Sequence, residues 1–291
     1  MKRYVYSYVE GPVLTKWSIE SILQHASRET EGVVDVVVDF GLSRISVRIV
    51  GGEAVFPEGL VIPLDHLSSL PENFAYKIIN GRLQRLDLYS DGKYYKLKPV
   101  ALAAPPTLEI NGVQMHRTVD MDPWRDTLVK VSALGVLRGR KVLDICTGLG
   151  YSAIAEVVKG ARRVVTIEKD PNVLYFASLN PWSRGLGDER IEIVLGDAAE
   201  VLKELESEEF DAVFHDPPRY SLAGELYSRE FYREVYRVLK KGGVLFHYTG
   251  EPGKHSNMSF LKGVKKRLEE AGFEEVRWIE RAKGFKARKP T

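Results

Sequence analysis

Short β-branched and aromatic runs dominate the chain from Val33 to about Leu97. Gly-Gly, Asn-Gly and Asp-Gly pairs separate these runs, and such pairs favour tight turns between paired strands. The pattern therefore predicts a small strand-rich domain, with a helix before it around residues 18–27. The predicted strands read VVDVVVDF, RISVRIV, AYKII, LQRLDLY and YYKLKPV.

The segment Ala103-Ala104-Pro105-Pro106 indicates the exit from this domain. Two consecutive prolines continue neither a helix nor a central strand, because they lack backbone donors. We therefore predict a boundary near residue 110, with domains at 1–110 and 111–291.

Beyond that boundary, apolar runs alternate with helical stretches. Strands that are apolar throughout are buried on both faces, which is typical of a parallel sheet covered by helices on each side. The expected fold class is therefore α/β, a doubly wound Rossmann-like sheet following a β-rich domain. The predicted strands are KVLDIC (141–146), RVVTIE (163–168), IEIVLG (191–196), DAVFHD (211–216) and GVLFHYT (243–249).

Composition adds mainly exclusions. The chain of 291 residues is 44% hydrophobic and 28% charged, with a net charge of +2, so its global charge indicates no particular partner. No signal peptide or membrane-length apolar run is visible, and we expect a cytoplasmic protein. The single cysteine, Cys146, and the scattered histidines offer no zinc-ligand spacing, so no structural metal is expected. The few amide residues suit a thermophile.

The first strand of the predicted sheet runs into a glycine-rich turn, Thr147-Gly148-Leu149-Gly150. Glycines here let the backbone turn sharply and let a ligand approach main-chain atoms. The same residues with Ala153 also satisfy the dinucleotide pattern G-x-G-x-x-A, and a tight turn without a ligand is a further reading.

Three acids narrow the choice of ligand. Asp144 precedes the glycines, where a carboxylate suits a cationic ligand better than a pyrophosphate. Glu168 ends the second strand, a position from which a carboxylate accepts hydrogen bonds from ribose hydroxyls. Asp197 follows the third strand at the same sheet edge, where it could read an adenine amino group.

The fourth strand ends in Asp216-Pro217-Pro218-Arg219-Tyr220. The two prolines remove backbone donors, so carbonyls and the Asp216 side chain form an acceptor-only pocket. Such a pocket suits an exocyclic amino group, because accepting its two N–H hydrogens orients the nitrogen lone pair toward an electrophilic methyl. The alternative is that the prolines merely end a strand and Asp216 caps a helix.

Together these residues resemble the class I S-adenosylmethionine-dependent methyltransferases over roughly residues 115–291. The resemblance implies S-adenosylmethionine as cofactor, with the methionine moiety on Asp144 and the 147–150 loop, the ribose on Glu168 and the adenine on Asp197. The cofactor-binding residues predicted are Asp144, Thr147, Gly148, Gly150, Tyr151, Glu168, Lys169, Asp197 and Ala198.

The Asp-Pro-Pro segment is similar to the [DN]-P-P-[YFW] motif of amino-methyltransferases, with Arg219 in place of the aromatic residue. The order of motifs also resembles a group of archaeal methyltransferases that carry D-P-P-R after an N-terminal extension. This resemblance implies methylation of an exocyclic amino group of an rRNA or tRNA base. The implied catalytic residues are Asp216, Pro217, Pro218 and Arg219, and the implied substrate-binding residues are Tyr220, His116 and Thr118.

Support for an RNA partner comes from the C-terminal residues 281–291, which carry Arg281, Lys283, Lys286, Arg288 and Lys289 without an acid. Such a stretch can neutralise phosphates, and Phe285 could stack on a base. A solvated basic end is an equally good reading.

Three other functions remain open. A polyamine aminopropyltransferase has the same fold, uses decarboxylated S-adenosylmethionine and resembles this chain in the segment from Glu225 onward, but its amine-binding motif has an aspartate where Arg219 stands here. A nicotinamide-dependent oxidoreductase fits only the glycine pattern. A non-enzymatic RNA-binding protein would leave the intact loop and acids unexplained.

Overall fold

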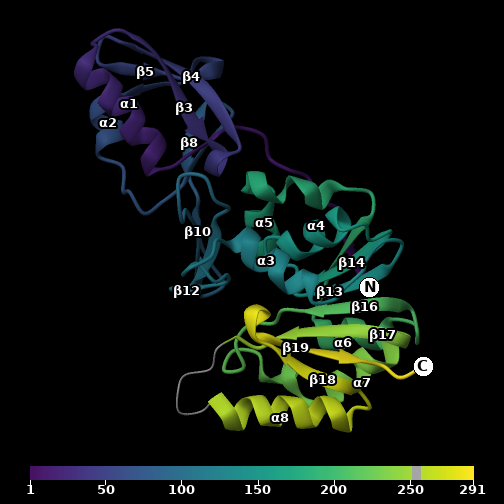
Figure 1. Ribbon diagram of the computed structural model, residues 1–291. Helices are drawn as coiled ribbons and strands as arrows, with labels where there is room; N and C mark the ends of the chain where they lie inside the picture. Colours follow the sequence, from purple (N-terminus) through teal and green to yellow (C-terminus); the bar gives the residue numbers. More distant parts are fainter. Residues whose placement is uncertain (251–256) are drawn as a thin grey trace. The chain divides into compact units, whose positions relative to one another are not determined.

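The computed structural model describes residues 1–250 and 257–291, and the chain forms two compact units (Figure 1). The sheet unit consists of Met1–Tyr6, Arg125–Leu174 and Gly185–Thr291. The strand-rich unit consists of Ser7–Trp124 and Tyr175–Arg184. None of the helices in the described residues is long and apolar enough to cross a membrane.

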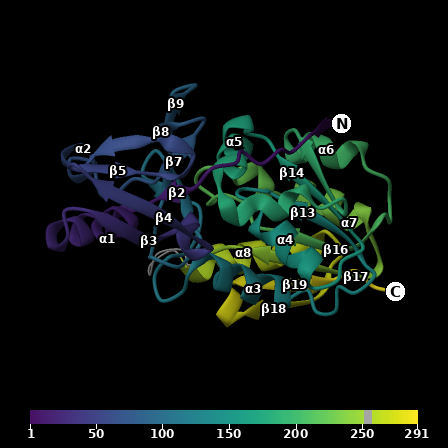
Figure 2. The same cartoon turned by 90° about the horizontal axis from the view of Figure 1, so that it is seen from above.

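The strand-rich unit is built from three small antiparallel sheets. In one of them, the buried faces of β3 and β4 pack against α1, which lies along β3 (Figure 2). Its helices are α1 (Lys16–Arg28) and α2 (Leu64–Ser68). Its sheets contain β3 (Gly32–Val38), β4 (Ser43–Val50), β5 (Glu53–Val55) and β6 (Val61–Pro63); β2 (Val13–Leu14), β7 (Tyr76–Ile79) and β8 (Arg82–Arg85); and β9 (Asp87–Ser90), β10 (Lys93–Lys98), β11 (Thr107–Ile110) and β12 (Val113–Gln114).

The strand-rich unit continues past the position where the sequence suggested its exit. Pro105 and Pro106 lie just before β11, and β11 then pairs with β10 and β12. A proline pair placed ahead of a strand leaves the hydrogen-bonding ladder intact, so it does not end the sheet. The division therefore lies at Trp124–Arg125 rather than at residue 110, and Met1–Tyr6 belongs to the sheet unit.

The sheet unit contains one eight-stranded sheet in the order β1-β15-β14-β13-β16-β17-β19-β18. Strands β13 to β17 are parallel, while β1, β19 and β18 add antiparallel edges. The predicted doubly wound α/β fold with a β-rich N-terminal domain is confirmed. The strands are β1 (Lys2–Tyr4), β13 (Lys141–Ile145), β14 (Arg163–Glu168), β15 (Ile191–Leu195), β16 (Phe210–His215), β17 (Leu239–Tyr248), β18 (Glu274–Ile279) and β19 (Gly284–Arg288).

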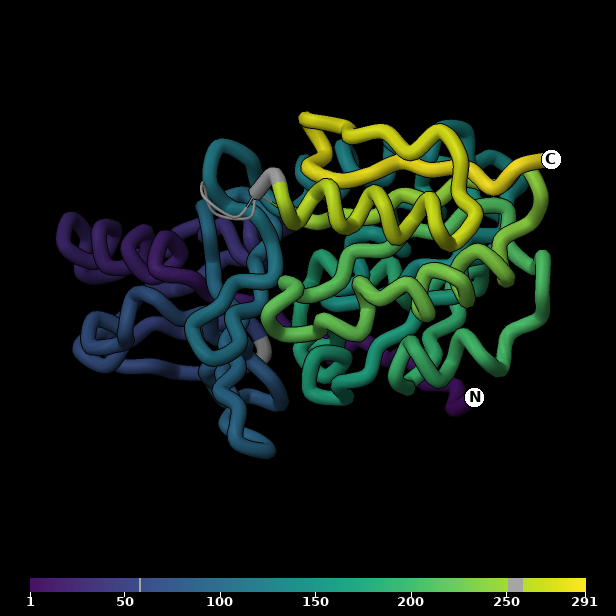
Figure 3. The backbone as a smooth tube through the Cα atoms, turned by 90° about the horizontal axis from the view of Figure 1, so that it is seen from below, coloured from purple at the N-terminus to yellow at the C-terminus, as the bar shows by residue number. Residues whose placement is uncertain are grey.

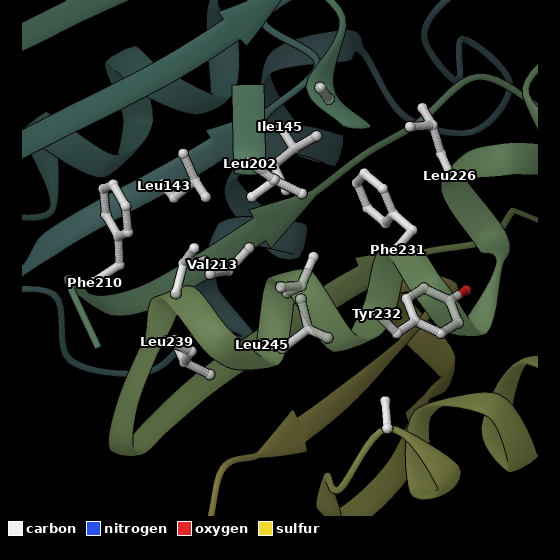
Figure 4. Close-up of a cluster of buried hydrophobic side chains, with 14 of the residues drawn as sticks. Leu143, Ile145, Leu202, Phe210, Val213, Leu226, Phe231, Tyr232, Leu239 and Leu245 are labelled. Atoms are coloured by element: carbon white, nitrogen blue, oxygen red, sulfur yellow. The ribbon is translucent and has the colours of Figure 1, made fainter. Parts of the chain in front are cut away.

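Helices cover both faces of this sheet. Alternate strand residues such as Leu143, Ile145 and Leu245 point into a buried apolar cluster with α6, α7 and α8 (Figure 4). On the other face, α4 contacts β13, β14 and β15 (Figures 1 and 2). The helices are α3 (Pro123–Ser132), α4 (Tyr151–Val158), α5 (Pro171–Leu179), α6 (Ala198–Glu204), α7 (Arg229–Val238) and α8 (Asn257–Glu270).

The basic C-terminal segment is not a solvated tail. Strand β19 lies between β17 and β18, and the β18–β19 hairpin runs beside α8 (Figure 3). Lys289 is 6% exposed and donates to the carbonyls of Leu239 at 2.7 Å and Tyr236 at 3.1 Å. Because its ammonium is hydrogen-bonded to these carbonyls inside the fold, Lys289 stabilises the end of the sheet. Its charge is not presented to a phosphate backbone.

We expect Lys289→Ala to lower the free energy of unfolding by about 1–3 kcal/mol, because two buried carbonyls lose their donor. The matched control is Arg288→Ala, which removes the same charge from a side chain 51% exposed and paired only loosely with Glu275 at 3.8 Å. The free energy of unfolding of Arg288→Ala should differ from that of the wild type by no more than about 0.5 kcal/mol. Equal losses in chemical unfolding would contradict the assigned role of Lys289.

Candidate active site

Four acidic residues lie at the carboxyl ends of four neighbouring parallel strands. Asp144 is in β13, Glu168 is the last residue of β14, Asp197 follows β15 and Asp216 follows β16. The chain runs outward from β13 to β15 and then returns to β16 on the other side of β13. This reversal of strand order leaves a crevice at the sheet edge, which is where open α/β sheets bind ligands.

Asp144 is fully buried beneath the glycine loop, on the α4 face of the sheet. Its Oδ2 accepts a hydrogen bond from the Thr166 hydroxyl at 2.6 Å, while its Oδ1 has no hydrogen-bond partner among the described residues. Burial raises the pKa of Asp144 to about 7, and the hydroxyls of Thr166 and Ser152 only partly offset it. An unsatisfied buried carboxylate oxygen is an acceptor suited to a cationic group of a ligand.

A second buried acid, Glu156, lies behind Asp144 on α4 and was not anticipated from the sequence. It is 0% exposed, and neither of its carboxyl oxygens has a partner among the described residues. Burial, reinforced by the charge of Asp144, raises the pKa of Glu156 well above its usual value. Since Glu156 looks like an ordinary polar residue within YSAIAEVV, only the packing of α4 on the sheet shows it to be buried.

The glycine loop adopts the conformation that its sequence predicts. Gly148 and Gly150 have φ angles of 54° and 82°, a region that residues with a Cβ rarely enter. A Cβ on Gly150 would also lie 2.5 Å from the side chain of Leu186. Tyr151 then begins α4 with 2% exposure, and the Thr147 hydroxyl lies 2.6 Å from that of Thr166.

Glu168 is held rigidly against this loop. One carboxylate oxygen accepts from the backbone N–H of Gly148 at 3.0 Å, and the other accepts from those of Lys169 and Asp170, each at 3.0 Å. Burial raises the pKa of Glu168, while these amides oppose the rise. Both lone pairs of Oε1 are used by these amides, whereas Oε2 has a further lone pair, so the predicted contact with a ribose hydroxyl is compatible with these bonds at Oε2. The Lys169 side chain itself is exposed.

Asp197 has the plainer role of a helix cap in this structure. Its side chain is exposed, and its Oδ1 accepts from the N–H of Ala199 at 2.9 Å at the start of α6. Ala198, 7% exposed, occupies the first turn of the same helix. Adenine recognition by this pair stays a prediction.

Asp216 forms an ion pair that sequence reasoning missed. Its Oδ2 lies 2.9 Å from the Lys130 ammonium, which is also 2.9 Å from Asp126 Oδ2 and 3.5 Å from the centroid of the Tyr248 ring. Burial disfavours the ammonium, but the charges of Asp216 and Asp126 outweigh it and raise the pKa of Lys130. The i, i+4 spacing of Asp126 and Lys130 on α3 was the available signal, although it is usually a surface pattern.

The Asp216 side chain is only partly buried. It is 27% exposed, and its Oδ1 makes no hydrogen bond to any described residue. Burial raises the pKa of Asp216, and the Lys130 ammonium partly opposes this. The predicted acceptor pocket thus keeps one carboxylate oxygen available to a ligand, although the other is committed to Lys130.

An aromatic cluster supports the turn that follows Asp216. The Tyr227 hydroxyl donates to the Pro218 carbonyl at 2.9 Å, and the Tyr220 ring packs against Tyr227 and Phe260 with centroid distances of 5.5 and 5.4 Å. Pro217 is buried, whereas Tyr220 is 54% exposed. Arg219 is also exposed, and its guanidinium forms no ion pair with any residue in the described part of the chain.

Two of the predicted substrate residues lie in the strand-rich unit. His116 Nδ1 is 3.0 Å from the Thr107 hydroxyl, and the Thr118 hydroxyl donates to Gln114 Oε1 at 2.9 Å. These contacts give His116 and Thr118 local structural roles. Their contribution to the substrate pocket stays a prediction.

Below the turn, His215 and His247 stack on adjacent strands with ring centroids 4.4 Å apart. Both are 0% exposed, and neither ring nitrogen of His215 has a partner among the described residues. Burial lowers the pKa of His215 well below its usual value and that of His247 to about 3. Both rings are therefore neutral at pH 7 and act as packing groups.

The family follows from comparison with known proteins. The model of the spermine/spermidine synthase domain matches residues 121–279, more than half of the chain. An uncharacterized protein of Methanocaldococcus jannaschii is 45% identical over 290 residues, which is 99% of this chain and 96% of that protein. The chain belongs to the spermine/spermidine synthase domain family.

Two less similar proteins are a polyamine aminopropyltransferase and a spermidine synthase. The polyamine aminopropyltransferase of Korarchaeum cryptofilum is 28% identical over 218 residues, covering 73% of this chain and 65% of that enzyme. A crystal structure of spermidine synthase with a transition-state analogue has the same fold, with a TM-score of 0.56, 23% identity and coverage of 74% of each chain.

The family corrects the function expected from the sequence. RNA-base methylation is wrong, because the matching family model is that of the spermine/spermidine synthase domain, and the relative from Korarchaeum cryptofilum, which aligns with 73% of this chain, is a polyamine aminopropyltransferase. The error arose at Asp216-Pro217-Pro218, since an acceptor pocket for an amine nitrogen serves both chemistries equally well. The coarser predictions, a transferase with a Rossmann-like fold and an S-adenosylmethionine-like donor, agree with the family.

The buried histidines generate a prediction about acid stability. Because the folded-state pKa of His215 is below the unfolded value of about 6.5, the folded chain loses stability as the pH falls below that value. We expect His215→Leu to reduce this loss between pH 6.5 and 5, by a slope approaching about 1.4 kcal/mol per pH unit. Chemical unfolding across pH measures it, with the exposed His66→Leu as control. An unchanged pH slope would show that His215 is not a buried neutral group.

Asp144 generates the opposite pH dependence. Its folded-state pKa of about 7 lies above the unfolded value of about 3.9, so stability from the neutral acid is lost as the pH rises toward 7. We expect Asp144→Asn to gain thermal stability relative to wild type from pH 4 to pH 7 and then to reach a plateau. The exposed Asp35→Asn is the control substitution. A pH-independent difference for Asp144→Asn would exclude the raised pKa.

Proposed function

We propose that this chain is an aminopropyltransferase-type enzyme that alkylates an amine with decarboxylated S-adenosylmethionine. The observation that carries the proposal is the placement of Asp216, with one free carboxylate oxygen, beside the glycine loop and Asp144 at one edge of the sheet. All of these residues fall within the segment that matches the spermine/spermidine synthase domain.

The electrostatics around Asp144 favour the decarboxylated donor. The charged groups that shift the pKa of Asp144 are the carboxylates of Asp216 and Glu168. Intact S-adenosylmethionine would bring its own carboxylate into this acidic surrounding, where like charges repel. A donor that ends in an ammonium alone would instead meet the unsatisfied Oδ1 of Asp144.

The chain's own residues fit such a donor. The positive φ angles at Gly148 and Gly150 open the backbone to a ligand, and Glu168 is locked by three amides at the predicted ribose position. The donor supplies an activated carbon, because its sulfonium sulfur leaves as a neutral thioether. This step needs no metal, because the positive charge of the sulfonium already activates the carbon.

The role of Asp216 follows from the needs of the nucleophile. An amine attacks only through a free lone pair, so it must reach the site without its extra proton or lose that proton there. Asp216 Oδ1 can accept an N–H hydrogen bond and orient the lone pair toward the donor carbon. As the new N–C bond forms, the C–S bond breaks with its electron pair going to sulfur, and the excess proton on nitrogen passes to Asp216 or water.

We expect calorimetric titration to show binding of decarboxylated S-adenosylmethionine about tenfold or more tighter than S-adenosylmethionine. Asp216→Asn should retain donor binding and lose transfer to amines by about 10²–10⁴-fold, since the general base is removed without changing side-chain size. Asp35→Asn, at an exposed position on β3 of the strand-rich unit, is the control for turnover. Preference for S-adenosylmethionine, or near-wild-type turnover in Asp216→Asn, would overturn the proposal.

A further inference from the structure

Lys130 is surrounded by the groups that normally recognise a small organic ammonium ion. Two carboxylate oxygens, from Asp126 and Asp216, lie 2.9 Å from its nitrogen, and the Tyr248 ring centroid lies 3.5 Å away. Charge-assisted hydrogen bonds and an aromatic face are together the usual means of binding a primary ammonium. We call Asp126, Asp216 and Tyr248 the ammonium cage.

Among the described residues, Lys130 and Asp126 are the buried part of this group, whereas Asp216 and Tyr248 are partly exposed. The side chains of Lys130 and Asp126 are 3% and 2% exposed, whereas Asp216 is 27% exposed. The Lys130 side chain is attached to α3, so its ammonium is held next to the cage. Even a short flexible link gives an effective concentration on the order of millimolar, and a helix that fixes the side chain in place gives a higher one. A free amine that enters the crevice cannot readily displace it.

The charges at the cage leave room for one more cation. The Lys130 ammonium contacts one oxygen of each carboxylate, and Asp216 Oδ1 is the oxygen of the partly exposed carboxylate that forms no hydrogen bond with a described residue. The second positive charge of a diamine would need another carboxylate near the Asp-Pro-Pro turn. The position three residues after Asp216 instead carries Arg219, an exposed guanidinium without an ion pair among the described residues.

We propose that Lys130 is an internal ammonium that permanently occupies one amine-binding position, so that the acceptor is a monoamine rather than an α,ω-diamine. The inference rests on the proposed function, because it identifies the acceptor class of the same site. Lys130 is a specificity-determining and positioning residue, since it acts through Asp216 and does not itself touch the reacting atoms.

The first test is acceptor preference of the wild-type enzyme with decarboxylated S-adenosylmethionine. We expect kcat/KM for n-butylamine to exceed that for 1,4-diaminobutane by about tenfold or more, because binding the second ammonium would leave it unpaired. A preference for the diamine would overturn the inference, while leaving the proposed alkyl transfer intact. If decarboxylated S-adenosylmethionine does not bind, the proposed function and the acceptor class fall together.

The second test empties the cage. In Lys130→Ala, the ratio of kcat/KM for the diamine to that for the monoamine should rise by about tenfold or more, since one end of the diamine can now occupy the cage. A general loss of activity with an unchanged ratio would show that Lys130 has only a structural role and would overturn the inference.

A third test measures amine binding at the ammonium cage through thermal stability, without catalytic turnover. Lys130→Ala leaves two carboxylates close together, so n-propylammonium chloride should raise its thermal midpoint saturably above an equal concentration of sodium chloride. The matched control is Lys77→Ala, because Lys77 is 0% exposed but its ammonium binds the Tyr8 hydroxyl and the Leu179 carbonyl. Equal rescue of both variants, or rescue of neither, would show that no ammonium cage exists. If Lys130→Ala does not fold even with the amine present, the wild-type acceptor preference decides the inference.

Discussion

The parallel pairing of β13 with β14 on one side and β16 on the other is the constraint on which the site depends. This ladder sets Asp144 opposite Thr166 and Phe214, and it brings the ends of β14 and β16 to the same edge. The glycine loop, Glu168 and Asp216 are therefore neighbours although they are far apart in sequence. A one-residue change of register would turn Asp144 away from α4 and remove its contact with Thr166.

Several ionisable side chains are buried at this sheet edge. Some of them are paired with opposite charges and others are not. Lys130 is compensated by two carboxylates and an aromatic ring, so that charge can persist in an apolar surrounding. Asp144 and Glu156 lack such compensation, and burial raises the pKa of each. The two uncompensated acids lie beneath the glycine loop, at the proposed donor position, where a cationic group of a ligand would supply the missing partner. The compensated Lys130–Asp216 pair lies at the proposed acceptor position.

These two arrangements explain how the chain can belong to the spermine/spermidine synthase domain family and still depart from its amine-binding pattern. The proposed donor side has a glycine loop and an acidic surrounding. The proposed acceptor side has an arginine at position 219 and the Lys130 ammonium paired with Asp216. Both changes add positive charge on the side where a polyamine would need negative charge, so we place the difference between this chain and its named relatives in the acceptor.

The sequence by itself determined the doubly wound sheet, the β-rich unit before it and the glycine turn, because period, turn chemistry and backbone φ requirements are local properties. It did not determine the course of residues 281–291, whose basic composition suggested a tail although β19 pairs inside the sheet. Nor did it reveal that Lys130 and Glu156 are buried, because a charged residue on a helix normally faces solvent. Only the tertiary packing of α3 and α4 on the sheet removed these side chains from water and brought Lys130 to Asp216, 86 residues away along the chain.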